Sequence, residues 1–306
     1  MTEQDNSNSA TSQAAILLRL DKGRRRWRLL AVVAVVCFLL TVFALDQTRD
    51  TQHKTPHIAH ITVEGLITDS LHSQKVLEDL SANPATKAVL VYVDSPGGTM
   101  VGGLNMYHNL RRLAAEKPVV TVMGTVAASA GYMVSAAGEH IVASPGTLTG
   151  SIGVMMPLVD ATELARKVGI ESEEVVSGAY KASTSPLKER SADERAYLQD
   201  TVMEMQGVFM ELVKTRRGLS AEAAQTVSDG RILTGVSAHD LGLVDSLGSR
   251  HTALAWLNTE KGVSKDVPLV DVSIYKKKSF FETMLSGAQT VLFSKPHGRA
   301  IMAIMD

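Results

Sequence analysis

The feature that most constrains the fold of this chain is an alternation of short apolar runs with segments of helical periodicity. Apolar runs with strand character occupy residues 58–63, 88–93 and 118–123. One helix-like segment lies near 70–82, and a second lies between the last two apolar runs and ends at about residue 116. Strands that alternate with helices in this way predict a layered α/β domain, in which helices cover a central sheet. The chain of 306 residues is long enough to give such a domain a sizeable core.

A long helix is expected in the second half of the chain. Ser191 and Glu194 have the spacing of a capping box, and apolar residues then recur at helical intervals up to Gly218, a suitable C-terminal cap. Its methionines, among them Met203 and Met205, are expected mainly to pack against neighbouring elements, with a contribution to a subunit interface as the alternative.

Two glycines follow the apolar run at 88–93, where the chain reads Asp94-Ser95-Pro96-Gly97-Gly98 before a helix-like segment. Because glycine has no side chain to cover the backbone, N–H groups at such a junction are accessible to a developing negative charge. Gly98 is therefore a candidate oxyanion donor. An ordinary turn between a strand and a helix is the alternative.

Small residues also surround Ser129, which follows the apolar run at 118–123. The sequence Ala127-Ala128-Ser129-Ala130-Gly131 is a loosened version of the G-x-S-x-G nucleophile elbow, with alanine in place of the first glycine. The residue after the nucleophile commonly supplies an oxyanion donor, so the N–H of Ala130 would act together with that of Gly98. A small-residue helix that packs closely against a sheet is the alternative interpretation.

Four ordered stretches resemble the signal peptide peptidase A (protease IV) family of serine peptidases, which implies a Clp protease/crotonase-like fold. They are Asp94–Gly98, Ala127–Tyr132, Thr149–Val154 and Ser177–Lys181, and the resemblance covers roughly residues 58–258. It implies that Ser129 is the nucleophile, Lys181 the general base, Gly98 and Ala130 the oxyanion donors, and Ser151 a hydroxyl that orients the lysine. The family often has glycine directly after the nucleophile, whereas this chain has Ala130.

A lysine acts as a base only when its pKa falls well below the ordinary value of about 10.4, through desolvation or neighbouring charge. The residues next to Lys181 include no acid that would hold its ammonium group charged. The resemblance further implies a homo-oligomeric ring in which the serine and lysine of one site come from neighbouring subunits. It also implies apolar peptide substrates, such as remnant signal peptides.

Three alternatives stay open at the level of sequence. A histidine such as His108 or His140 could approach Ser129 in three dimensions and act as the base. The chain could instead be a noncatalytic membrane scaffold of the same fold. It could also be a hydratase-like acyl-thioester enzyme that uses the oxyanion donors without the Ser129 hydroxyl.

Composition and motifs assign no cofactor and no metal. There is no His-Glu-x-x-His motif, and a single cysteine cannot form a cysteine cage. A net charge of −1 and an aromatic content of 5% likewise give no reason to expect nucleic-acid binding.

The N-terminal region predicts a single membrane anchor. Residues 1–28 form a polar tail with a basic end, 29–45 an uncharged apolar run, and 46–57 a polar linker before the peptidase domain at 58–258. As a helix, the apolar run would span about 26 Å, near the lower limit for a bilayer. The basic flank predicts a cytoplasmic N-terminus, and hence a single-pass protein of the cytoplasmic (inner) membrane whose catalytic domain faces outward. A cleaved signal peptide is the alternative.

The last segment, residues 259–306, is expected to form a C-terminal extension. Its lysines at 276–278 precede several apolar residues. This pattern suits either a basic amphipathic helix on a membrane or another subunit, or an ordinary helix packed on the domain.

Overall fold

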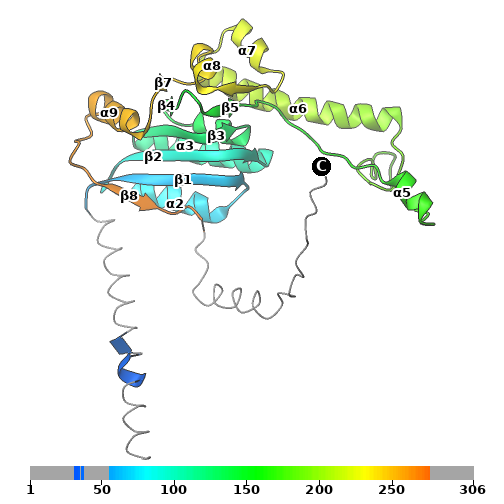
Figure 1. Ribbon diagram of the computed structural model, residues 1–306, viewed down its shortest axis with the longest axis horizontal. Coiled ribbons are helices and arrows are strands. Elements are labelled where there is room, and N and C mark those ends of the chain that lie inside the picture. Colours follow the sequence, from blue (N-terminus) through cyan, green and yellow to red (C-terminus); the bar gives the residue numbers. More distant parts are fainter. Residues whose placement is uncertain (1–30, 35, 38–54, 276–306) are drawn as a thin grey trace, which may run out of the picture. The chain divides into compact units, whose positions relative to one another are not determined.

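The computed structural model describes residues 31–34, 36, 37 and 55–275 (Figure 1). By its contacts the chain divides into Met1–Thr55 and Pro56–Asp306, and the fold below belongs to the second unit. The predicted tail at 1–28, most of the anchor at 29–45 and most of the linker lie outside the described residues, as does the C-terminal extension after residue 275. Within the part that is described, no helix has the length and apolar character needed to cross a membrane.

A central sheet organises the second unit, with strand order β6-β5-β3-β2-β1-β8, and with β4 and β7 continuing from β3. The β5–β6 pairing is antiparallel, whereas the other pairings among the described strands are parallel. The strands are β1 (His57–Ile67), β2 (Thr86–Gly98), β3 (Val119–Ala128), β4 (His140–Ala143), β5 (Leu148–Gly150), β6 (Ile232–Thr234), β7 (Ser246–Leu247) and β8 (Leu269–Val272).

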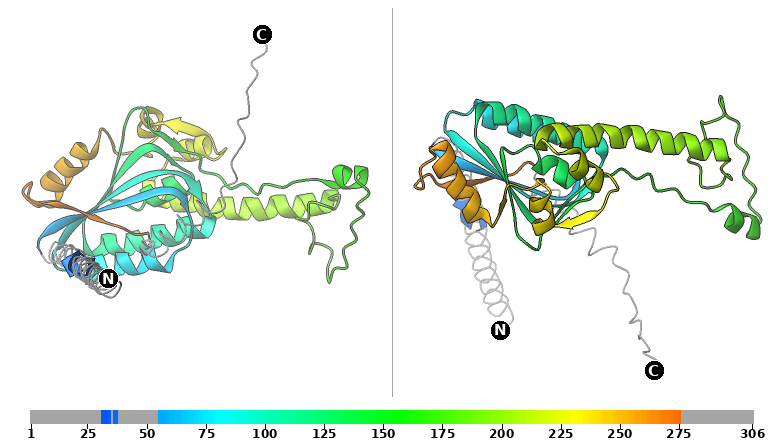
Figure 2. Two further views of the ribbon diagram at one scale, coloured as in Figure 1. Left: turned by 60° about the horizontal axis from the view of Figure 1, so that its bottom comes forward. Right: turned by 90° about the horizontal axis from the view of Figure 1, so that it is seen from above.

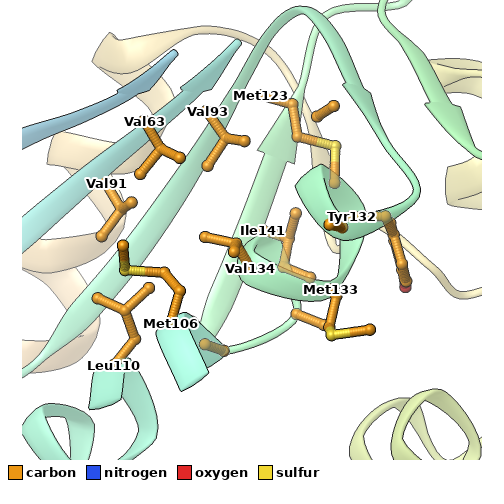
Figure 3. Close-up of a cluster of buried hydrophobic side chains, with 14 of the residues drawn as sticks. Val63, Val91, Val93, Met106, Leu110, Met123, Tyr132, Met133, Val134 and Ile141 are labelled. Carbon is orange, nitrogen blue, oxygen red and sulfur yellow. The ribbon is translucent and has the colours of Figure 1, made fainter. Parts of the chain in front are cut away.

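Both faces of the sheet are covered, as the continuous apolar run in β2 requires for a parallel strand. Val89, Val91 and Val93 point into one core, shared with α2 (Leu71–Ala82), α3 (Met100–Glu116), α4 (Ala130–Ser135) and α6 (Ala192–Arg217), part of which Figure 3 shows. Ala88 and Leu90 point to the other core, which α9 (Arg250–Lys261) covers. The side-chain alternation of a strand therefore divides one apolar run between two layers.

The prediction of a layered α/β domain is confirmed, and the main helices lie where the sequence placed them. The long helix α6 begins with the expected capping box of Ser191 and Glu194 and ends at Gly218, which has φ 59°. Strands β2 and β3 are longer than predicted: they run past Asp94 and Met123 and pair again through Ser95 and Ala127 after a register shift. Strand β8 lies beyond the predicted domain end at 258 and pairs with β1 in the same sheet.

Helix α6 extends beyond the sheet, and residues 153–190, here called the arm, run beside its N-terminal half (Figures 1 and 2). The arm includes α5 (Thr162–Lys167) near the far end of α6. The short helices α7 (Ala221–Val227) and α8 (Gly235–Asp240) follow the C-terminal end of α6. The arrangement therefore has a layered body and a projecting helix with its arm, and the candidate site involves both.

Candidate active site

Ser129 lies at the junction of β3 and α4 in a conformation that few side chains adopt. Its φ is 54° and its ψ is −121°, and among the described residues only Ser129 and Ser151 combine a side chain with a positive φ. Its N–H donates to the Gly150 carbonyl at 2.9 Å, and its own carbonyl accepts from the Met133 N–H at 3.0 Å. Its hydroxyl does not cap α4. Strain of this kind is typical of functional sites, and here it leaves the hydroxyl free for chemistry.

Gly97 lies directly against Ser129, and neither Gly97 nor Gly98 has room for a side chain. A Cβ on Gly97, whose φ is 131°, would lie 3.0 Å from Ser129 Cβ and 3.3 Å from Ser129 Oγ. A Cβ on Gly98 would lie 1.9 Å from the Ile67 carbonyl oxygen. The Gly97 N–H already donates to Ser95 Oγ at 3.1 Å. Gly98 therefore stays the candidate for the oxyanion donor of the two glycines.

Ala130 fits the elbow despite the glycine that the family often has there. Ala130 is buried, and a Cβ on Gly103 would lie 3.0 Å from Ala130 Cβ. The methyl group of Ala130 therefore packs against α3 at Gly103, which has no side chain. Ala130 is the first residue of α4, and its N–H therefore has no carbonyl one turn earlier in the helix. The absence of a side chain at Gly103 of α3 thus leaves space for the methyl group of Ala130.

A cavity of about 980 Å³ opens at these residues. Ser129, Gly98, Ala130 and Ser151 all line it, so the fold brings together four of the five predicted site residues. Much of the remaining lining is apolar and flexible: it includes Leu66, Met100, Met133, Val154, Met155, Met156, Val202, Met203, Met205 and Phe209. Methionine adapts its shape readily, so this lining suits varied apolar side chains. Met203 and Met205 of α6, expected from the sequence to pack against neighbouring elements, thus also line the cavity of Ser129.

Ser151 follows β5 with φ 49°, and its N–H donates to the Arg231 carbonyl at 2.8 Å. The buried side chain of Gln206 holds the next residue in place, since Gln206 Nε2 donates to the Ile152 carbonyl at 2.9 Å and to the Ser228 carbonyl at 3.2 Å. Nothing in the sequence distinguished Gln206, because a glutamine in a long helix is ordinarily a surface residue. In this fold it ties α6 to the Ser151 loop.

Lys181 lies in the arm and does not line the cavity around Ser129. It is exposed, and among the described residues its ammonium group has no ion pair or hydrogen bond. The ring of Tyr180, its neighbour, stacks on Tyr197 near the start of α6 with centroids 4.7 Å apart. The part of α6 that lines the cavity begins at Gln199, and neither Tyr180 nor Tyr197 belongs to the lining. Within one chain, the predicted base therefore lies outside the cavity that contains the predicted nucleophile.

The histidines proposed as alternative bases lie elsewhere. His140 Nε2 contacts Ser246 Oγ at 2.9 Å, its ring stacks on Trp256, and burial lowers its pKa. His108 packs edge-on against Tyr107. Of the described residues that line the cavity, none is a histidine. The geometry therefore gives no support to a histidine base within one chain.

Tyr132, in the motif that follows Ser129, has a structural role. It is fully buried, and its hydroxyl donates to the Leu243 carbonyl at 3.1 Å. Burial raises its pKa far above the ordinary value, so the hydroxyl stays protonated. The side chain anchors α4, and thereby the elbow, to the loop that precedes β7.

Comparison with known proteins supports a peptidase. The model of "Peptidase family S49" matches residues 111–264, a segment that contains Ser129, Ser151 and Lys181 and begins after Gly98. "Putative protease slr0021" of Synechocystis sp. is 37% identical, over 68% of this chain and 76% of the relative. "Putative signal peptide peptidase SppA" of Enterococcus faecium is 30% identical, over 71% of this chain and 67% of the relative. "Serine protease SPPA, chloroplastic" of Arabidopsis thaliana is 34% identical, over 61% of this chain and 28% of the relative.

Proposed function

Because the chain belongs to peptidase family S49, we propose that it is a serine endopeptidase with Ser129 as the nucleophile and Lys181 as the general base. The observation that carries the proposal is the strained backbone of Ser129, whose Oγ lies against the bare backbone of Gly97 at the mouth of a large cavity. A strained serine with accessible backbone donors beside it suits acyl transfer.

The proposed reaction passes through an acyl-enzyme. Neutral Lys181 Nζ takes the hydroxyl proton as Ser129 Oγ attacks the carbonyl carbon of the scissile bond. The N–H groups of Gly98 and Ala130 then stabilise the negative charge that forms on the carbonyl oxygen. As the C–N bond breaks, Lys181 returns the proton to the leaving amine, and the acyl group remains on Ser129 as an ester. Water, deprotonated by Lys181, attacks that ester and regenerates the serine.

The lysine of each site comes, in this proposal, from a second copy of the chain in a homo-oligomeric ring. Lys181 is absent from the cavity of its own chain, where its side chain is exposed. The arm also exposes large apolar side chains: Met155 is 87% exposed, Val159 66% and Val175 97%. Contact with another copy would bury such residues and desolvate Lys181, which lowers its pKa toward the range useful for a base.

Apolar peptides are the proposed substrates, with remnant signal peptides as the natural source. The methionine-rich cavity beside Ser129 supports an apolar preference, and the name of the Enterococcus relative supports a signal-peptide substrate. The apolar run at 29–45 would hold the enzyme in the cytoplasmic (inner) membrane, with its catalytic domain on the outward side. Such an anchor would keep the cavity close to substrates that are released within the bilayer.

Hydrolysis of an apolar reporter peptide by the full chain in detergent tests this function. We expect Ser129→Ala and Lys181→Ala each to fall to background while the chains still assemble. Co-assembly of the two variants at equal amounts should then restore about a quarter of the wild-type activity, since half the sites receive an intact serine and half of those an intact lysine. Activity that survives in Lys181→Ala would contradict the lysine base, and mixed oligomers without recovery would contradict a site shared between copies.

A further inference from the structure

The arm has almost no apolar core of its own. Within residues 153–190, only Ala165 and Ser183 are buried. Beside Ser183, on the first turn of α6, lies the buried carboxylate of Glu194, which is only 5% exposed. A charged group is costly to bury unless it is paired and hydrogen-bonded, so its contacts indicate what the burial achieves.

The Glu194 carboxylate joins the start of α6 to the arm. It accepts from the Ser191 N–H at 3.0 Å, which completes the capping box, and from Ser183 Oγ at 3.2 Å. It also pairs with Lys188 Nζ. The hydrogen bond from Lys188, and then that from the Ser191 N–H, lowers the pKa of Glu194 to about 2, so the carboxylate is charged at neutral pH. The helix cap requires only the contact with the Ser191 N–H, so the contacts with Ser183 and Lys188 serve another purpose.

The side chain of Arg190 binds backbone carbonyls of the same segment. Its Nε donates to the Ser183 carbonyl at 2.9 Å, and its Nη2 donates to the Ser185 carbonyl at 3.2 Å and the Val159 carbonyl at 2.8 Å. These contacts link the segment at Val159 to the segment at Ser183–Ser185 within the arm. The segment that contains Lys181 is thus attached to α6 by the Ser183–Glu194 hydrogen bond and by the stacking of Tyr180 on Tyr197.

Lys181 lies between two of these attachment points. On one side, Tyr180 stacks on Tyr197 of α6, and on the other, Ser183 Oγ contacts both the Tyr180 carbonyl, at 2.9 Å, and Glu194. Because Lys188 balances the charge of Glu194, the attachment does not add an unpaired negative charge that would keep a nearby lysine protonated.

We propose that Glu194, acting through Ser183, is a positioning residue for the general base Lys181. This inference rests on the proposed function, because it assigns Glu194 a role in the reaction only if Lys181 is the base. The contacts hold the short Tyr180–Ser183 turn against a rigid helix, so that the lysine enters the site of another copy in one orientation. A base displaced by about 1 Å commonly costs about 100-fold in rate.

The test compares Glu194→Gln and Ser183→Ala with Ser191→Ala and Lys181→Ala in the full, assembled chain. Ser191→Ala is the matched control, because it removes the Ser191 Oγ contact with the Glu194 N–H from the same helix cap but leaves the carboxylate on Ser183. We expect Glu194→Gln and Ser183→Ala to lower kcat for the reporter peptide by about 10- to 100-fold with little change in KM. The acid limb of their kcat/KM profiles should move to higher pH, because a loosely held lysine is better solvated. Ser191→Ala should show neither effect.

Two outcomes separate this inference from the proposed function, and a second variant covers a failure to assemble. If Lys181→Ala is inactive but Glu194→Gln and Ser183→Ala behave as Ser191→Ala does, the positioning role is overturned and the lysine base stands. If Lys181→Ala remains active, both are overturned. Should Glu194→Gln fail to assemble, Ser183→Ala decides alone, since it replaces one hydroxyl with hydrogen at a single buried side chain.

Discussion

Replacing Gly97 with alanine should abolish peptide hydrolysis and leave the sheet folded. At φ 131°, a residue with a side chain is strained by about 1–3 kcal/mol, which a domain of this size tolerates. The added methyl carbon would lie 3.0 Å from Ser129 Cβ and 3.3 Å from Ser129 Oγ, in the space that a scissile carbonyl must enter. Because a misplacement of 1 Å costs about 100-fold, we expect kcat/KM to fall by about that factor or more.

Gly65→Ala is the matched control for this substitution. Gly65 also has a positive φ, of 67°, but a Cβ there would have no heavy atom within 4 Å. Both variants should lose stability of the order of 1–3 kcal/mol in denaturant unfolding, owing to backbone strain. Only Gly97→Ala should lose hydrolysis of the reporter peptide. If Gly97→Ala keeps activity close to that of Gly65→Ala, the assignment of this backbone to the reacting centre is refuted.

Two further predictions concern the elbow and the arm. Ala130→Gly should lower the free energy of unfolding by about 1–2 kcal/mol, because it removes a buried methyl group and lowers helix propensity. It should leave kcat/KM nearly unchanged, and a large change in kcat/KM would show that the methyl group reaches the site. The depressed pKa of Glu194, about 2, predicts stability that is present above the ordinary carboxyl value and lost as pH falls from there toward 2. The difference in melting temperature between wild type and Glu194→Gln should therefore be constant at neutral pH and shrink below about pH 4; a difference unchanged down to pH 2 would contradict the pairing.

The interior of the sheet could be predicted from sequence because runs such as Val89–Val93 carry their own strand signal. The ends of the same strands could not. Small residues such as Gly98 and Ala128 have weak strand preferences, and here long-range contacts hold them extended: Ser95 pairs with Ala127, and Ser95 Oγ donates to the Gly65 carbonyl at 2.6 Å. These extensions place Gly98 and Ser129 at the same edge of the sheet, so the least predictable part of the fold builds the site.

Site residues were predictable to the extent that their chemistry depends on local sequence. Ser129 and Gly98 stood out because small residues must surround an elbow and an accessible backbone. Ser151 and Lys181 came only from the family resemblance, since one serine and one exposed lysine carry no local signal. The structure adds a reason for choosing Gly98 over Gly97 that the sequence lacks, because the Ser95 hydroxyl accepts from the N–H of Gly97.

Helix α6 connects the two halves of the proposed mechanism. Its middle lines the cavity of Ser129 and holds the Ser151 loop through Gln206, while its first turn holds the Lys181 turn through Glu194. If each Lys181 acts in the site of a neighbouring copy, α6 holds parts of two sites. It holds the surroundings of Ser129 in its own chain, and it holds the lysine that enters the site of the neighbouring copy. A change in the tilt of α6 would then disturb two sites at once. This explains why a helix that projects from the domain is anchored at both points by buried polar contacts instead of apolar packing alone.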